Sequence, residues 1–338
     1  MTPIAIIGAG GWGTALAITM ARARTDGGPR TDVRLWAYEP YLVETLIATR
    51  ENPLYLPSVR VPESVRVSNS LEEVLSGARI VIVAVPSHVF RHVFSQMLPL
   101  VNREMLFVSA AKGIENDTLM RMSQVLSDVA GPRFTASVAA ISGPTFAPEV
   151  ARGEPTALVV ASPDAELRIF LQKELSSPTF RLYTNPDLIG VEIAAAVKNI
   201  IAIAAGVVDG LGLGSNPAAA LITRGVAEIT RLVVACGGKR ETLSGLAGLG
   251  DLVLTSYGTL SRNRRVGVAL GQGKDIHEVL SNMRMVAEGV NTAKSTVALA
   301  RKLNVEMPIA EKMYSVLHEG LKPHDAINDL MERKLREE

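Results

Sequence analysis

Apolar residues in the first half of the chain form short, nearly continuous runs separated by helix-like segments. The runs are rich in Val, Ile and Ala and cover 4–8, 33–38, 79–86, 105–111, 137–143, 156–162 and 180–184. Strands that are apolar on both faces and alternate with helices are typical of a mostly parallel sheet covered on both sides. The pattern therefore predicts an α/β domain with a doubly wound, Rossmann-type sheet and right-handed crossovers.

The strand-like pattern stops after Pro186. A helix is predicted over 187–209, and a second helix begins with Asn216 as N-cap and Pro217 at its first position and ends at Gly237–Gly238. Further helices are predicted over 260–271, 288–304 and 308–319, with a solvated helical tail at 329–338. A chain of 338 residues suits two domains. We expect an α/β domain at 1–190 and an all-α domain at 191–338.

One segment, 188–208, is apolar enough to resemble a membrane span. It carries Glu192, Lys198 and Asn199, and charges in the middle of a span are costly in lipid. We therefore expect a helix buried in a protein core and no stable membrane insertion.

Composition narrows the classes of partner. Lys and Arg number 35 against 34 Asp and Glu, and aromatic residues make up 4%, so neither the charge nor the aromatic content favours nucleic acid. Cys236 is the single cysteine, which excludes an intramolecular disulfide and suits a buried thiol in a reducing compartment. The N-terminus lacks a signal-peptide pattern, so a cytoplasmic location is expected. No metal site is predicted.

The segment "GAGGWGTALA" follows the first predicted strand and opens a helix. Its glycines Gly8, Gly10 and Gly13 have the G-x-G-x-x-G spacing of a dinucleotide-binding turn. In such a turn the first glycine permits the bend, the second lets the backbone approach a pyrophosphate, and the third lets helix and strand pack closely. The phosphates then lie at the helix N-terminus, which favours anions.

An acidic residue at the end of the second strand would bind the ribose 2′-hydroxyl of such a cofactor. Glu39 is the candidate, and it favours NAD over NADP because it would repel a 2′-phosphate. Arg34 and Tyr38 lie close enough in sequence to oppose that preference, and Glu39 as a simple surface charge stays an alternative.

Ligands of doubly wound sheets bind beyond the carboxyl ends of the strands. Lys112 follows one strand and is placed to reach an anion in the cleft, although a surface lysine in a turn is the alternative. His88 follows another strand and is interpreted as the start of a helix rather than as an acid or base.

Lys198 lies in the apolar helix among alanines. Burial lowers the pKa of a lysine, which then exchanges protons near neutral pH, but a structural ion pair is the alternative. Asp251 follows a glycine-rich bend, and Ser261, Arg262 and Asn263 offer donors suited to a phosphate. The alternative for these last residues is a helix N-cap at Ser261 followed by solvated arginines.

Six segments, in this order, resemble bacterial NAD(P)-dependent glycerol-3-phosphate dehydrogenases. They are "GAGGWGTALA" (8–17), "AAKGI" (110–114), "ISGPTFAPEV" (141–150), "AAAVKNIIAIAAG" (194–206), "GLAGLGDLVLT" (245–255) and "SRNRRVG" (261–267), and the resemblance covers nearly the whole chain. It implies reversible reduction of dihydroxyacetone phosphate, a small phosphorylated three-carbon substrate, to sn-glycerol 3-phosphate for glycerophospholipid synthesis. NAD or NADP is the implied cofactor, and a homodimer is expected.

The resemblance also implies residue roles. Lys198 resembles the catalytic proton donor and acceptor, and Asp251 is expected to orient it or a substrate hydroxyl. The implied substrate-binding residues are Lys112, Gly143, Thr145, Asp251, Ser261, Arg262 and Asn263. The implied cofactor contacts, beyond Gly8, Gly10, Gly13 and Glu39, are Gly11, Trp12, Tyr38, Lys112, Ala147, Arg262, Val286 and Glu288. Thr145 stands where serine is common, and Tyr38 where many relatives carry histidine or arginine, which weakens any preference for NADP.

Two other functions fit these residues. One is a lysine-using β-hydroxyacid dehydrogenase, in which the 261–265 cluster binds a carboxylate. The other is a dinucleotide-sensing protein without catalysis, which a buried Lys198 makes less attractive.

Overall fold

The computed structural model describes residues 2–25, 28–29, 32–283 and 287–335. An eight-stranded sheet runs in the order β12-β11-β10-β9-β8-β1-β4-β7. Its strands are β1 (Ile4–Ile7), β4 (Val33–Trp36), β7 (Val65–Ser68), β8 (Ile80–Val83), β9 (Leu106–Ser109), β10 (Ser137–Ser142), β11 (Thr156–Ala161) and β12 (Phe180–Asn185). All neighbouring pairs are parallel except β10–β11. The predicted α/β fold class is confirmed, although the sequence pattern missed β7, a short edge strand.

The strand order reverses direction at β1, which pairs with β4 on one side and β8 on the other. All four residues of β1 are buried because helices cover both faces of the sheet. In a doubly wound sheet, the crevice beyond the carboxyl ends of the strands at this reversal is the usual ligand site. The glycine-rich turn that follows β1 therefore lies at the expected position.

Seven α-helices accompany the described part of the sheet. They are α1 (Gly11–Arg22), α2 (Pro40–Thr49), α3 (Leu71–Leu75), α4 (Phe90–Met97), α5 (Met122–Ala130), α6 (Ala147–Arg152) and α7 (Ala165–Leu175). A short 3₁₀ helix, η1 (Ser87–Val89), precedes α4, as expected for His88. Two hairpins were not predicted, β2 (Arg24–Thr25) with β3 (Gly28–Pro29) and β5 (Glu51–Asn52) with β6 (Leu56–Arg60).

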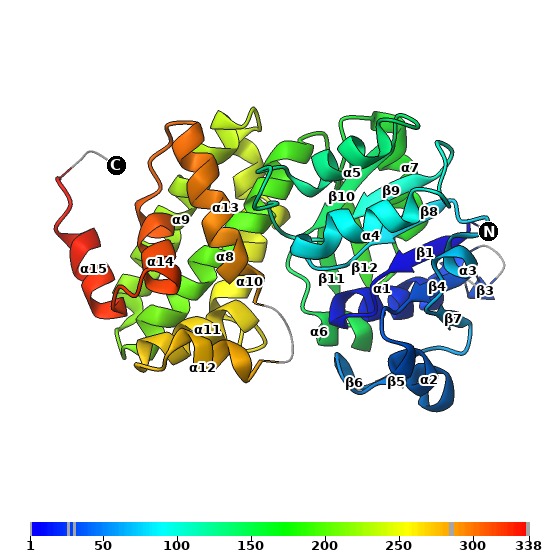
Figure 1. Cartoon of the computed structure of the whole chain (residues 1–338), viewed down its shortest axis with the longest axis horizontal. Coiled ribbons are helices and arrows are strands. Elements are labelled where there is room, and N and C mark those ends of the chain that lie inside the picture. The colour runs from blue at the N-terminus through cyan, green and yellow to red at the C-terminus, as the bar shows by residue number, and fades with distance from the viewer. Residues whose placement is uncertain (1, 26–27, 30–31, 284–286, 336–338) are drawn as a thin grey trace.

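The second half of the chain is helical, and Figure 1 shows it on the left, beside the sheet domain on the right. Its α-helices are α8 (Leu188–Gly210), α9 (Ser215–Ala235), α10 (Asp251–Tyr257), α11 (Arg262–Gly271), α12 (Ile276–Ser281), α13 (Glu288–Lys302), α14 (Pro308–His318) and α15 (Pro323–Met331). The segment before α10 contains the short turns η2 (Arg240–Ser244) and η3 (Leu246–Gly250).

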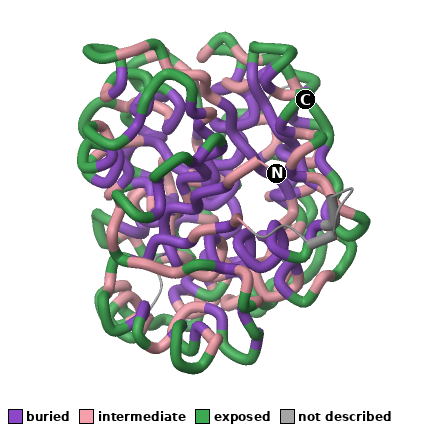
Figure 2. The backbone as a smooth tube through the Cα atoms, turned by 90° about the vertical axis from the view of Figure 1, so that its right-hand side faces the viewer, coloured by how far each residue is buried: buried purple, intermediate pink, exposed green. Residues whose placement is uncertain are grey.

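Helix α8 is the centre of this half and packs against α9, α10, α11, α13 and α14. It is long and apolar enough to cross a membrane, but its most apolar stretch is entirely buried inside the protein, as the sequence predicted. In Figure 2 the buried stretches run through the interior and the exposed ones form the outer loops. Close packing of α8 on α11 depends on glycine: a Cβ on Gly267 would lie 1.9 Å from the Ile203 carbonyl oxygen.

Three local predictions are wrong. Helix α9 is capped by Gly214 and begins at Ser215, so Asn216 is a helical residue and not the N-cap. The predicted helical tail at 329–338 is helical only as far as Met331, residues 332–335 are not helical, and 336–338 lie outside the described residues. Cys236, at the end of α9, is only partly buried. The predicted N-cap of α9 is thus displaced by two residues from the observed one.

The two halves are joined by polar contacts as well as by the chain. The Glu192 carboxylate on α8 accepts hydrogen bonds from the Ser123 backbone N–H (2.8 Å) and pairs with Arg121, both at the start of α5. Because Glu192 is buried, removing the Arg121 guanidinium would leave its carboxylate without a counter-charge in the interior. This contact fixes α8, and the residues it carries, relative to the sheet.

Candidate active site

The glycine turn between β1 and α1 has the geometry of a phosphate cradle. Gly8 has φ +114°, a conformation that favours glycine, and a Cβ on Gly13 would lie 1.8 Å from the Gly8 carbonyl oxygen. A Cβ on Gly10 would meet nothing within 4 Å, so space for a ligand is open above the N-terminus of α1. The buried indole N–H of Trp12 has no hydrogen-bond acceptor within the described chain. These features fit a dinucleotide pyrophosphate.

The β5–β6 hairpin lies against this turn. The Asn52 amide donates hydrogen bonds to the Ala9 carbonyl and the Thr14 hydroxyl, both at 2.9 Å. A Cβ on Gly11 would lie 2.8 Å from the Tyr55 carbonyl oxygen, so the hairpin backbone is in close contact with the turn. Sequence reasoning missed both Asn52 and Tyr55, because a short irregular hairpin has no periodic pattern.

Glu39 follows β4 and occupies the N-cap position of α2, but its side chain makes no capping bond. Its carboxylate instead accepts a hydrogen bond of 2.9 Å from the Tyr55 hydroxyl. Tyr38 is 71% exposed beside it. Ala147 opens α6, and its Cβ lies 3.8 Å from where a Cβ on Gly11 would be. The structure therefore brings Glu39 and Ala147 to the glycine turn.

Asp251, at the start of α10, is the centre of the polar site between the two halves. Its two carboxylate oxygens accept from different lysines, Oδ1 from Lys198 Nζ and Oδ2 from Lys112 Nζ, each at 2.7 Å. Lys198 comes from α8 and Lys112 from the loop after β9. The Asp251 side chain is 2% exposed, so both ammonium groups are held by one buried counter-charge.

Burial and charge set the proton affinities of these groups. Desolvation lowers the pKa of Lys198 to about 8, opposed by the attraction of Asp251 and assisted by the nearby charge of Lys112. The pKa of Asp251 is lowered: burial alone would raise it, but the two ammonium groups together outweigh burial. Lys198 Nζ also donates 2.6 Å to Thr255 Oγ1 on α10, a residue that the sequence analysis did not single out. An amine with a pKa near 8 both gives and takes protons at physiological pH.

The loop after β10 closes one side of this site. The Gly143 carbonyl accepts from Lys112 Nζ and from the Thr145 hydroxyl, both at 3.1 Å. Gly143 has φ +157° and leaves no space for a side chain, since a Cβ would lie 2.7 Å from the Cβ of Leu158. The Gly143 carbonyl thus joins Thr145 to Lys112, and the resemblance assigns all three residues to the substrate.

Helix α11 supplies the cluster expected to bind phosphate, and its three residues differ. Ser261 is the N-cap, and its hydroxyl accepts from the Arg264 backbone N–H at 3.2 Å. Asn263 donates to the Asn199 side chain at 2.9 Å and accepts from the Gly289 backbone N–H at 3.0 Å, so it ties α8 to α13. Ser261 is thus a helix N-cap, which was the alternative to a phosphate-binding role. The hydrogen bonds of Asn263 connect helices of the domain. Burial lowers the pKa of Arg262, and Glu288 opposes that shift.

Glu288 is the first residue of α13 and accepts a hydrogen bond of 3.2 Å from the Ser87 backbone N–H after β8. Burial raises its pKa, while that bond and the charges of Arg262, Lys112 and Lys198 act in the opposite direction. Glu288 therefore lies among the cations of the site. Val286, also expected to contact the cofactor, lies outside the described residues.

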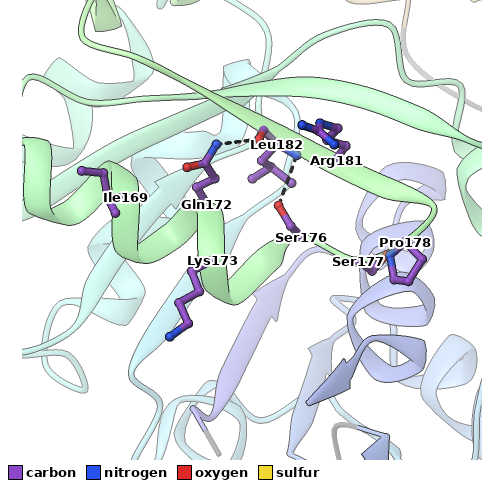
Figure 3. Close-up of a pocket in the computed structure, with 8 residues that line it drawn as sticks. All are labelled: Ile169, Gln172, Lys173, Ser176, Ser177, Pro178, Arg181 and Leu182. Carbon is purple, nitrogen blue, oxygen red and sulfur yellow. Dashed lines mark hydrogen bonds between the residues drawn. The ribbon is translucent and has the colours of Figure 1, made fainter. Parts of the chain in front are cut away.

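A separate surface pocket lies elsewhere, between α7 and β12 (Figure 3). It is lined by Gln172, Lys173, Ser176 and Arg181, among others, and Gln172 donates to the Leu182 carbonyl at 2.9 Å. None of the residues singled out by the sequence lines it. The candidate site is therefore the polar cluster at the junction of the two halves.

Comparison with known proteins agrees with this geometry. Residues 3–168 match the family model for the N-terminus of NAD-dependent glycerol-3-phosphate dehydrogenase, and residues 187–328 match the model for its C-terminus. A glycerol-3-phosphate dehydrogenase [NAD(P)+] of Koribacter versatilis is 54% identical over 334 residues, covering 98% of each chain. One from Geobacter sulfurreducens is 51% identical, covering 99% of this chain and 98% of the relative.

A solved structure leads to the same family. The glycerol-3-phosphate dehydrogenase of Coxiella burnetii superposes with a TM-score of 0.92 at 43% identity, covering 98% of this chain and 99% of that one. Both halves of the chain thus match the same family, and the match covers nearly the whole length. The chain belongs to the NAD-dependent glycerol-3-phosphate dehydrogenase family.

Proposed function

We propose that this protein catalyses the reversible reduction of dihydroxyacetone phosphate to sn-glycerol 3-phosphate with NADH or NADPH, and so supplies the backbone of glycerophospholipids. The family supports the reaction. The observation that carries the chemistry is Lys198, a 4% exposed lysine whose ammonium group is hydrogen-bonded to Asp251 at the junction between the sheet and the helical half.

Lys198 is the proposed acid and base. A bound nicotinamide supplies the hydride when the ketone is reduced. Negative charge then develops on the carbonyl oxygen, and the Lys198 ammonium stabilises that charge and transfers a proton to the oxygen. In the reverse direction the neutral amine accepts the hydroxyl proton. Asp251 holds Lys198 Nζ in one position, and Thr255 supplies a second, uncharged acceptor.

The phosphate is proposed to bind beside this lysine. Arg262 offers a forked guanidinium that matches phosphate oxygens, and Lys112 adds a second cation. Gly143, Thr145, Ser261 and Asn263 complete the proposed substrate set. Binding energy from the phosphate, which does not react, would hold the carbonyl carbon in line for hydride transfer.

The dinucleotide is proposed to cross the crevice from the glycine turn to the lysine. The backbone N–H groups of Gly10, Gly11 and Trp12 would hold its pyrophosphate at the N-terminus of α1, and Gly8 and Gly13 shape the turn. Tyr38 and Glu39 flank the adenosine end. Ala147, Glu288 and Val286 are proposed along its length, with Lys112 and Arg262 in contact with both ligands.

Three further features belong to the proposal. The dinucleotide-binding domain is 1–190 and the helical substrate domain 191–338, close to the start of α8. The protein acts in the cytoplasm. It works as a homodimer, as the resemblance to the family implies.

The test is a spectrophotometric assay at the absorbance of NADH, with dihydroxyacetone phosphate and, separately, small keto acids. Oxidation of NADH with dihydroxyacetone phosphate alone supports the proposal. Activity with keto acids alone would favour a β-hydroxyacid dehydrogenase, and binding of NADH without turnover would favour a dinucleotide sensor. Inorganic phosphate should compete with dihydroxyacetone phosphate and not with NADH.

A further inference from the structure

The loop between β9 and α5, which carries Lys112, closes on itself. Ile114 and Arg121 form an antiparallel β-bridge, and the Glu115 backbone N–H donates to the Met120 carbonyl at 2.9 Å. Lys112 lies two residues before this bridge, and Arg121 is one of its two members. The position of Arg121 is therefore coupled to that of the segment that presents Lys112.

The helical half holds this loop at two points. On α8, the Glu192 carboxylate accepts from the Ser123 backbone N–H at 2.8 Å and pairs with the Arg121 guanidinium. On α13, the hydroxyl of Ser295 donates to the Ile114 carbonyl at 3.1 Å. Glu192 and Ser295 are both buried, so these bonds are stronger than they would be in water.

The sheet half contacts the same loop. A Cβ on Gly113 would lie 2.3 Å from Ser87 Oγ, so the loop backbone packs closely on the segment after β8. Glu115 also pairs with Arg91 of α4 at 2.9 Å. These contacts remain when the contact with α8 is removed, so a change at Glu192 is expected to shift the loop without unfolding the sheet half.

Helix α8 carries both Glu192 and Lys198, which lie about 9 Å apart along its axis. Lys198 donates to Oδ1 of Asp251, and Lys112 donates to Oδ2, each at 2.7 Å. A lysine side chain is long and flexible, so its ammonium group keeps one position only if its backbone is fixed as well. Through Glu192, the helix that bears one of these lysines also holds the loop that bears the other.

We propose that Glu192 is a positioning residue that, by holding this loop, keeps the Lys112 ammonium group on Asp251 and within reach of the substrate phosphate. The inference rests on the proposed function, in which Lys112 binds that phosphate. When the loop is released, the phosphate loses one of its two proposed cations, so the substrate should bind more weakly. The release of Lys112 also changes the surroundings of Lys198.

The charges around Lys198 give this release a characteristic sign. Asp251 on α10 and Glu288 on α13 raise the pKa of Lys198, whereas the charge of Lys112 lowers it. Arg262 on α11 acts on Glu288 in turn. When Lys112 moves away, the pKa of Lys198 should therefore rise. A direct effect of the lost carboxylate on α8 has the opposite sign, because removing a negative charge favours the neutral amine.

The main variant is Glu192→Gln, and Glu228→Gln is the matched control. Glu228 is 2% exposed on α9 and likewise accepts backbone N–H groups, those of Ile309 and Ala310, but these bonds lie within the helical half. Thermal melts show whether each variant folds. A double variant, Arg121→Met with Glu192→Gln, leaves neither charge of the pair unpaired, and it replaces the single variant if that one does not fold.

The first measurement needs neither cofactor nor substrate. Acetic anhydride modifies lysine amines, and peptide mass spectrometry gives the rate at Lys112 relative to that at the exposed Lys173 of α7. The Lys112 side chain is 16% exposed and bonded to Asp251, so it should react slowly in the wild type. In Glu192→Gln the rate should rise by about threefold to tenfold, and in Glu228→Gln it should not change.

The second measurement is kcat and KM for dihydroxyacetone phosphate with NADH as a function of pH. In Glu192→Gln, KM should rise by about threefold to tenfold while kcat at the optimal pH changes by less than about twofold, since binding and not chemistry is lost. The pH midpoint for reduction should lie above that of the wild type. In a Lys112→Ala background, Glu192→Gln should change neither KM nor the midpoint further, because it acts through Lys112.

Any of four results would overturn the inference. Unchanged modification of Lys112 in Glu192→Gln would mean that α8 does not hold the loop. A midpoint that is unchanged or lower would mean that Lys112 stays near Lys198. Equal effects in Glu228→Gln, or additive effects with Lys112→Ala, would mean that the substitution weakens the fold in general. If modification of Lys112 rises but the wild type does not reduce dihydroxyacetone phosphate, the proposed reaction fails and the role of Glu192 in holding Lys112 stands.

Discussion

Removing the charge of Asp251 should move the pH dependence of catalysis. In the wild type, reduction of dihydroxyacetone phosphate needs the Lys198 ammonium, so its rate should fall as the pH rises through the lysine pKa of about 8. Oxidation of sn-glycerol 3-phosphate needs the neutral amine and should rise across the same range. Asp251→Asn keeps the shape of the side chain and takes away the counter-charge of both lysines.

The size of the effect follows from the distance. A unit pair 2.7 Å apart, as for Lys198 and Asp251, attracts by roughly 6 kcal/mol at an effective dielectric constant of about 20. Solvent and side-chain relaxation reduce this value, but even a quarter of it, about 1.5 kcal/mol, corresponds to about one pH unit. The midpoint for reduction should therefore fall to about 7 or lower, and the ammonium fraction at pH 8 from about one half to about one tenth.

The assay is kcat/KM for dihydroxyacetone phosphate at saturating NADH between pH 5.5 and about 9.5, a range that brackets both midpoints. Thr255→Val is the control, because it removes the uncharged acceptor of Lys198 and leaves Asp251 in place. Its midpoint should move less than that of Asp251→Asn. Thermal melts confirm that each variant is folded, since an unpaired buried charge costs about 3–5 kcal/mol.

Two outcomes would refute this reasoning. A midpoint for Asp251→Asn equal to or above that of the wild type would show that Asp251 does not set the proton affinity of Lys198. If the variant does not fold, the pH profiles of the wild type still test the reasoning. If the rates of reduction and oxidation do not change in opposite directions near pH 8, Lys198 is not the group whose titration controls the rate.

Four other substitutions test separate parts of the molecule. Lys198→Met should lower turnover by about 10²–10⁴ while NADH binding stays within about twofold, as measured by fluorescence; near-normal turnover would contradict the catalytic role. Arg262→Ala should raise KM for dihydroxyacetone phosphate by about tenfold or more, and leave the weak reduction of unphosphorylated dihydroxyacetone unchanged if the guanidinium binds phosphate. Gly13→Ala places a Cβ 1.8 Å from the Gly8 carbonyl oxygen, so NADH binding and the melting temperature should both fall; retention of both would show that the turn can rearrange. Burial raises the pKa of Glu228 to about 7 from 4.5, so the folded protein keeps a proton that the unfolded chain loses, and stability should fall as the pH rises through that window. Glu228→Gln should remove up to roughly 3 kcal/mol of that pH dependence in urea unfolding, and parallel curves for the two proteins would refute it.

Local sequence patterns determined much of this protein. The apolar runs predicted seven of the eight strands of the sheet, because a strand that is buried on both faces consists almost entirely of apolar residues. The spacing of Gly8, Gly10 and Gly13 predicted the turn, since backbone sterics act over a few residues. Lys198 was recognisable because burying a lysine among alanines in a long apolar helix disfavours its charged form, so such a residue is a candidate for a functional role.

Tertiary structure alone decided which polar groups meet. Asp251 binds two lysines that are 53 and 139 residues away in the chain, and nothing in its glycine-rich surroundings indicates that it is shared. Asn263, which is proposed to bind the substrate, also bridges Asn199 and the backbone of Gly289, and no pattern in the sequence indicates these two contacts. Tyr55 reaches Glu39 from a hairpin that has no periodic pattern.

The physical reason is the range of each effect. Burial and backbone conformation are properties of a residue and its neighbours, so composition and spacing report them. A hydrogen bond between remote side chains depends on direction and on distances of a few tenths of an ångström, and these exist only once the sheet and the helices have packed.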